Sequence, residues 1–117
     1  MQRNQKIMAG NDHPKDKDQK NDENRLITDA KLEKYFSITK EALDKVRSSP
    51  MCKDRKDDAE DFLDMAQRYY DDAGHFRGRG DIVDAFAALN YAHGWLDAGA
   101  RIGLFKVKDS RLFTVDD

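Results

Sequence analysis

Apolar residues recur at intervals of three and four along three stretches of the chain, near residues 29–47, 54–77 and 81–103. This spacing places them on one face of an α-helix, because about 3.6 residues make one turn. Short segments that contain serine, proline or glycine separate the three stretches. We therefore predict an all-α fold, an up-and-down three-helix bundle.

The first predicted helix has a recognisable start and end. Thr28 or Asp29 can accept hydrogen bonds from the first unpaired amides, and a Ser-Ser-Pro sequence after Arg47 ends the helix because proline disfavours helical geometry in the residue before it. The predicted core face of this helix consists of Leu32, Phe36, Thr39, Leu43 and Val46.

The second predicted helix begins after Asp54, with Asp57 near its first turn, and ends at Phe76 or Arg77. The Gly-Arg-Gly sequence that follows allows a tight reversal, so the second and third helices should form an αα-hairpin. The apolar face of the second helix consists of Ala59, Phe62, Ala66, Tyr69, Ala73 and Phe76.

The third predicted helix, capped by Asp81, carries two apolar stripes. One stripe consists of Ile82, Phe86, Leu89, His93, Leu96 and Ala100, and the other of Ala88, Tyr91, Trp95, Ala98 and Ile102. Such a helix either lies between two neighbours or offers one side to another chain. Gly94, Gly99 and Gly103 suggest close backbone approach, and Asp97 and Arg101 have the spacing of an ion pair.

The two ends of the chain have a different composition from the bundle. Residues 1–25 contain few large apolar side chains, so we expect a disordered polar tail, followed by a bundle domain with a C-terminal extension over residues 26–117. After Phe105, a segment that contains Leu112, Phe113 and Val115 lacks a helical period, and we expect it to lie extended across the bundle.

Charge and cysteine content narrow the classes of function. Residues 1–25 carry six Lys or Arg against five Asp or Glu, and the remainder carries fifteen against eighteen, so nucleic-acid binding is not expected. Cys52 is the single cysteine, which excludes a disulfide within one chain and a zinc site built on cysteines. With no apolar run of membrane-spanning length and no signal-peptide core, we expect a cytoplasmic protein without membrane contact and without a cofactor.

A longer motif identifies a family. The segment YAHGWLDAGARIG, residues 91–103, follows a Gly-Asp helix start and an aromatic-rich helix. This pattern resembles the archaeal domain of unknown function 357 family, over about two thirds of the chain. The resemblance implies a small three-helix bundle from an archaeal cytoplasm, and it implies no activity because the family has none assigned. Residues 1–25 lie outside the family pattern.

The third predicted helix also carries the candidate partner-binding residues: Asn90, Tyr91, His93, Trp95, Asp97 and Arg101. His93 can be a core histidine that is hydrogen-bonded to a neighbour. It can also line a polar groove, because Asn90, Asp97 and Arg101 share its flank of the helix. Trp95 and Tyr91 are either core or an exposed contact site for a protein partner or for a second copy, as in a homodimer.

Two patterns on the second predicted helix suggest catalysis or metal binding. Arg68 and His75, with six residues between them, resemble the Arg-x4-6-His motif of HEPN ribonucleases, which are nucleotide-binding helical bundles. Asp72 and His75, with Asp71 beside them, have part of the spacing of di-iron bundles, but the second motif and the further carboxylates of such sites are missing. We therefore predict a non-enzymatic interaction or scaffold module that uses the third helix, and keep a HEPN-like nuclease or nucleotide-binding enzyme as the alternative.

Overall fold

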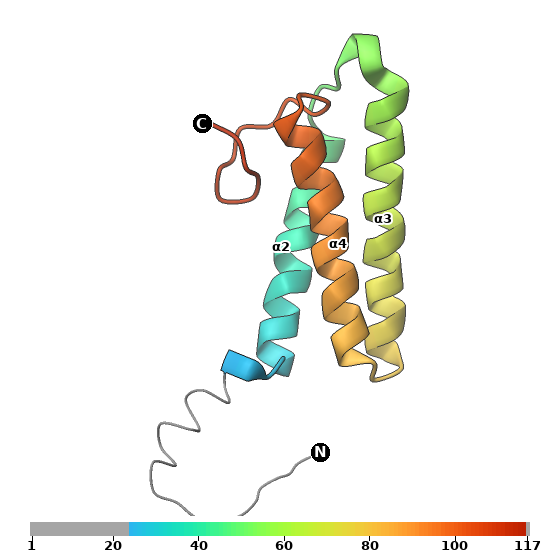
Figure 1. Ribbon diagram of the computed structural model, residues 1–117, viewed down its shortest axis with the longest axis vertical. Coiled ribbons are helices and arrows are strands. Elements are labelled where there is room, and N and C mark those ends of the chain that lie inside the picture. The colour runs from blue at the N-terminus through green and yellow to red at the C-terminus, as the bar shows by residue number, and fades with distance from the viewer. Residues whose placement is uncertain (1–23, 117) are drawn as a thin grey trace, which may run out of the picture.

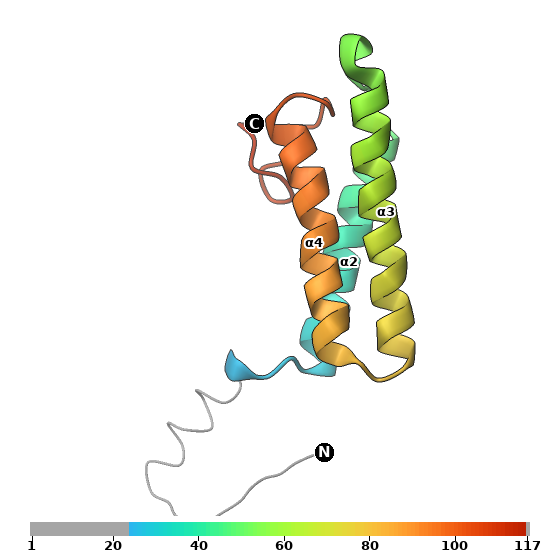
Figure 2. The same ribbon diagram turned by 45° about the vertical axis from the view of Figure 1, so that its right-hand side comes forward.

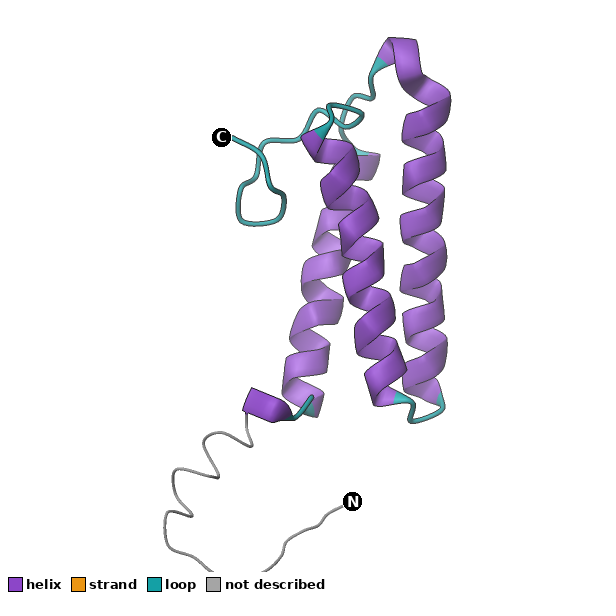
Figure 3. Ribbon diagram, viewed as in Figure 1, coloured by secondary structure: helices purple, strands orange, loops and turns teal. Residues whose placement is uncertain are grey.

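The computed structural model describes residues 24–116, which form an up-and-down bundle of three helices, as predicted. The elements are α2 (Asp29–Arg47), the short 3-10 helix η1 (Lys53–Arg55), α3 (Lys56–Gly78) and α4 (Ile82–Arg101). Figure 1 shows α3 antiparallel to both α2 and α4, and Figure 2 shows α2 packed behind the other two. In Figure 3 the described residues are coloured as helix or loop throughout. The predicted disordered segment 1–25 falls outside the described residues except for Asn24 and Arg25, which are helical.

Helix α2 matches its prediction at both ends. The Thr28 hydroxyl accepts a hydrogen bond from the Lys31 amide over 3.1 Å, which is the expected N-cap. The Ser48 amide donates to the Asp44 carbonyl and closes the last turn. All five residues of the predicted face are buried: Leu32, Phe36, Thr39, Leu43 and Val46.

Helix α3 begins at Lys56, within two residues of the prediction, but its capping differs from the expectation. The chain first makes the 3-10 turn η1, so Asp54 lies inside that turn, and Arg55 occupies the N-cap position without a side-chain hydrogen bond. Helix α3 ends at Gly78, slightly later than predicted. Ala59, Ala66 and Ala73 are completely buried at every second turn, and these small side chains let α4 pack closely along α3.

The predicted αα-hairpin between α3 and α4 is confirmed, and its turn has a specific hydrogen-bond pattern. Gly80 has φ +80°, its amide donates to the Arg77 carbonyl over 3.0 Å, and the Asp81 amide donates to the Phe76 carbonyl over 2.9 Å. This is a Schellman motif, in which a left-handed residue ends the helix and satisfies its last carbonyls. Asp81 occupies the N-cap position of α4 without a side-chain capping bond.

The buried face of α4 runs between the two predicted stripes. Ala85, Ala92 and Gly99, which belong to neither stripe, are buried with Leu89 and Leu96. Close approach is real at Gly99, where a Cβ would lie 2.8 Å from Phe105 Cδ2 and closer still to Cε2. It was wrongly predicted for the other two glycines. A Cβ on Gly94 would meet no atom within 4 Å, and Gly103 lies beyond the helix end with φ +83°.

The segment after α4 is not extended, contrary to expectation. The Cys52 amide donates to the Leu104 carbonyl and Met51 forms an isolated antiparallel bridge with Phe105, so the chain first crosses the end of the bundle. It then turns back along α4, where Leu112 and Phe113 are buried in the core. The turn forms because the Phe113 amide donates to the Asp109 carbonyl over 2.8 Å. We call residues 103–116 the C-terminal loop.

Candidate functional site

The outward surface of α4 carries a continuous row of apolar residues, which we call the outer stripe. It consists of Val83, Ala87, Tyr91, Gly94 and Ala98 of the helix and of Ile102, its C-cap residue, all of them exposed. The three large side chains are exposed by 70%, 52% and 53% for Val83, Tyr91 and Ile102. Val83 and Ala87 were not assigned to this stripe from the sequence, although they precede Tyr91 by eight and four residues and so share its face of the helix. Tyr91, Ala98 and Ile102 of this row are the part of the second predicted stripe that the bundle leaves exposed.

The remaining residues of that stripe are packed. Ala88 is buried, and the Trp95 ring contacts the edge of Phe62 on α3 at a centroid distance of 4.9 Å. The Tyr91 ring packs edge-to-face against the Tyr69 ring of α3, with a centroid distance of 4.4 Å. This contact restrains the Tyr91 ring at the border between the two helices. The Trp95 Nε1 is buried and has no hydrogen-bond partner among the described residues, an arrangement that costs about 1 to 3 kcal/mol.

A groove of about 460 Å³ lies between α2, α4 and the C-terminal loop. Asn90, His93 and Asp97 line it, as predicted, but Arg101 does not. Gly94 of the outer stripe also borders the groove. The opposite wall was not predicted and is formed by Lys34, Tyr35, Ile38, Thr39 and Arg111. Donors, acceptors and an aromatic ring therefore face one hollow, whose size suits a small polar ligand or a side chain of a partner.

His93 and Asp97 are engaged in holding the C-terminal loop. His93 Nε2 lies 2.6 Å from the Leu112 carbonyl oxygen. Because a carbonyl only accepts, Nε2 carries the proton. Asp97 accepts from the Thr114 amide and, over 2.8 Å, from its hydroxyl. The predicted pair between Asp97 and Arg101 was wrong, since the loop offers Asp97 closer donors.

Two ion pairs fasten the same loop to α2. Arg111 donates to both carboxylate oxygens of Glu41, and Lys45 lies 3.1 Å from Asp109. The hydrogen bond from Arg111 lowers the pKa of the Glu41 carboxyl. The hydrogen bond from Lys45 likewise lowers the pKa of the Asp109 carboxyl. Both carboxyls therefore favour the charged form while the loop is docked.

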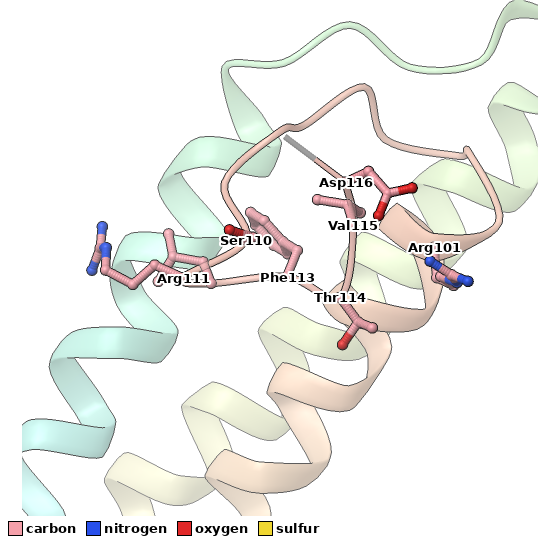
Figure 4. A pocket seen from close by; sticks show the side chains of 8 residues that line it. Arg101, Ser110, Arg111, Phe113, Thr114, Val115 and Asp116 are labelled. Atoms are coloured by element: carbon pink, nitrogen blue, oxygen red, sulfur yellow. The ribbon is translucent and has the colours of Figure 1, made fainter.

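Arg101 lies on the other side of the loop, as Figure 4 shows. It borders an open hollow of about 390 Å³ with residues 110–116, and its guanidinium is exposed. The six predicted partner-binding residues thus fall into three places. Asn90, His93 and Asp97 line the groove, Tyr91 lies in the outer stripe with Trp95 packed beside it, and Arg101 stands at the edge of the loop.

Arg68 and His75 are both exposed on α3, two turns apart and thus separated by about 10 Å along the axis. Arg68 is paired with Asp64 over 2.8 Å, and the His75 ring neighbours Phe76. Neither residue lines the groove or the hollow beside the loop. For residues 24–116, no three His, Cys, Asp or Glu side chains come together in a way that could hold a metal ion.

In the described part of the chain, each helix is too short or too polar to cross a membrane. Comparisons with curated proteins and with solved structures found no match. A family model described as "Protein of unknown function (DUF357)" matches residues 34–105, which contain most of α2 and all of α3 and α4. That match spans more than half of the chain, and the protein therefore belongs to the DUF357 family.

Proposed function

We propose that the protein is a non-enzymatic interaction module that binds a protein partner through the outer stripe of α4. The observation that carries this proposal is the exposure of Val83, Tyr91 and Ile102 in one row along a helix. Single exposed apolar residues are normal on a protein surface, whereas contiguous apolar surface is typical of an interface.

The composition of the stripe supports the proposal. Tyr91 and the neighbouring Trp95 are of the residue types that contribute most to binding energy in interfaces. Tyr91 is held upright by Tyr69, so little side-chain freedom remains to be lost on binding. Ala87 and Ala98 are small, which allows a partner to approach the helix closely.

The alternative of a nuclease has weaker support. Arg68 is occupied by Asp64 and stands on an open helix surface rather than in a pocket. A general base or a phosphate-binding arginine works best in a concave, partly dehydrated site. The outer stripe therefore gives the interaction module the stronger case.

The test compares two variants of the tagged full-length chain. One carries Tyr91→Lys with Ile102→Lys, which places charge in the outer stripe. The matched control carries Leu26→Lys, because Leu26 is 56% exposed but lies outside α4. Self-association is measured by light scattering, and partners are captured from cells of the native organism with and without nuclease treatment.

The proposal predicts a protein contact that the double variant loses and the control keeps. A chain that stays monomeric at high concentration and captures no protein would contradict it. Capture that depends on intact RNA, with cleavage of RNA that His75→Ala abolishes, would instead favour the nuclease.

A further inference from the structure

The outer stripe reads nearly the same from both of its ends. Its midpoint lies between residues 92 and 93. Residues at equal distances from that point match in size in the two outer pairs, whereas the central pair joins a large residue with a glycine. Val83 corresponds to Ile102, Ala87 to Ala98, and Tyr91 to Gly94. Each end of the stripe therefore carries a large residue, followed inward by an alanine. In the middle, the ring of Tyr91 lies next to Gly94, which has no side chain.

The charged residues beside the stripe are also arranged symmetrically about its midpoint. Asp84 and Arg101 are equally far from the midpoint, both are exposed, and within residues 24–116 neither has an ion-pair partner. If two α4 helices packed parallel and in register, Asp84 would lie level with Asp84 of the other chain, and Arg101 with Arg101. In an antiparallel pair, Asp84 of one chain stands at the height of Arg101 of the other, and the helix dipoles also oppose each other favourably.

From this symmetry, and resting on the proposed function of the stripe, we infer that the partner is a second copy of this chain. The two α4 helices pack antiparallel about a twofold axis at the stripe midpoint. A twofold interface uses the same patch on both subunits. In an antiparallel pair, each half of the patch must therefore be complementary to the other half. The outer stripe meets this condition in both size and charge.

The middle of the stripe has room for such packing. A Cβ on Gly94 would meet no atom within 4 Å, so the backbone there lies open. The ring of Tyr91 in one chain lies at the height of Gly94 in the other, where no side chain opposes it. Ala87 and Ala98 stand closest to the centre line of the stripe, and helices with alanine at the contact approach to about 8 Å between axes.

The first experiment adds charge where the monomer has space. Gly94→Glu should leave the fold intact, because the new side chain points into open surroundings. Gly74→Glu is the matched control: Gly74 is also an exposed helical glycine with no atom near its Cβ position, but it lies on α3. Sedimentation is measured from about 10 to about 500 µM, a range that covers weak dimers. We expect at least a tenfold loss of dimer affinity for Gly94→Glu, and no loss for Gly74→Glu.

The second experiment tests the direction of the helices. In a Cys52→Ser background, one chain carries Ala87→Cys and another carries Ala98→Cys. In the antiparallel register these two positions meet, whereas two copies of Ala87 lie about 16 Å apart along the axis. We expect oxidation to cross-link the mixture and to leave each variant alone largely uncross-linked.

The outcomes separate this inference from the proposed function. A monomer that still captures another protein through the outer stripe overturns the second-copy partner and leaves the interaction module standing. A dimer that Gly94→Glu does not weaken, or that cross-links only within one variant, overturns the antiparallel register. A monomer that captures no protein overturns both proposals.

Discussion

Two surfaces of α4 are not covered by α2 and α3, and they differ in whether the rest of the chain covers them. The flank with His93 and Asp97 is covered by the C-terminal loop, which buries Leu112 and Phe113 there. The outer stripe has no such cover, and Tyr91 stays 52% exposed. The chain thus folds its own C-terminal segment over one flank and leaves the other apolar surface open, and this difference is the basis of the proposed interaction.

The two surfaces should differ most in how much the removal of an aromatic side chain lowers the free energy of unfolding. Phe113→Ala removes a buried ring and should lower the free energy of unfolding by about 3 to 5 kcal/mol. Tyr91→Ala removes a half-exposed ring that contacts Tyr69 and should cost about 1 kcal/mol. Urea unfolding at low protein concentration, where no dimer contributes, measures both. Equal losses for the two variants would mean that the outer stripe belongs to the core.

The next prediction compares two glycines of α4. Gly99→Ala should destabilise by about 1 to 3 kcal/mol, because the added methyl group collides with the Phe105 ring. Gly94→Ala should stabilise the monomer by about 1 kcal/mol, since alanine favours the helix and the site is open. Thermal unfolding of both variants gives the signs. A stabilising Gly99→Ala would show that the loop is not held against α4.

The fold was largely predictable because it rests on local signals. The cap at Thr28, the proline after α2 and the glycine at the α3–α4 turn act within a few residues, and each was recognised. The 3-10 turn before α3 was not predicted because a 3-10 turn and a helical first turn use the same acidic residues. Asp54 lies in the first turn of η1, a position that suits an acidic residue just as an N-cap does.

The candidate site was only partly predictable because it depends on contacts distant in sequence. Periodicity found both apolar stripes of α4, but it could not show that Trp95 turns to Phe62 while Tyr91 faces outward. The far wall of the groove comes from α2, and the loop that closes it is placed by His93 and Asp97. Nothing within the sequence of the loop indicates these partners.

The smallest effect concerns the ion pairs that fasten the loop to α2. The pKa values of Glu41 and Asp109 are lowered in the folded chain by Arg111 and Lys45. Each carboxyl therefore contributes stability above its ordinary pKa of about 4, and this contribution is lost as the pH falls through the lower folded value. Exposed pairs contribute little, so we expect local loosening of the loop rather than unfolding.

Amide chemical shifts of Arg111 and Phe113, followed from neutral pH to about pH 2.5 across the carboxyl range, report on that loosening. A chain with Glu41→Gln and Asp109→Asn serves as the control, because it keeps every other carboxylate. The wild-type loop signals should shift on acidification, those of the control should shift less, and the outer stripe should respond equally in both chains. If the control shifted as much as the wild type, the loop would be held by Leu112, Phe113 and the bonds to α4 alone. The contrast between the covered and the open surface of α4 would then owe nothing to the ion pairs with α2.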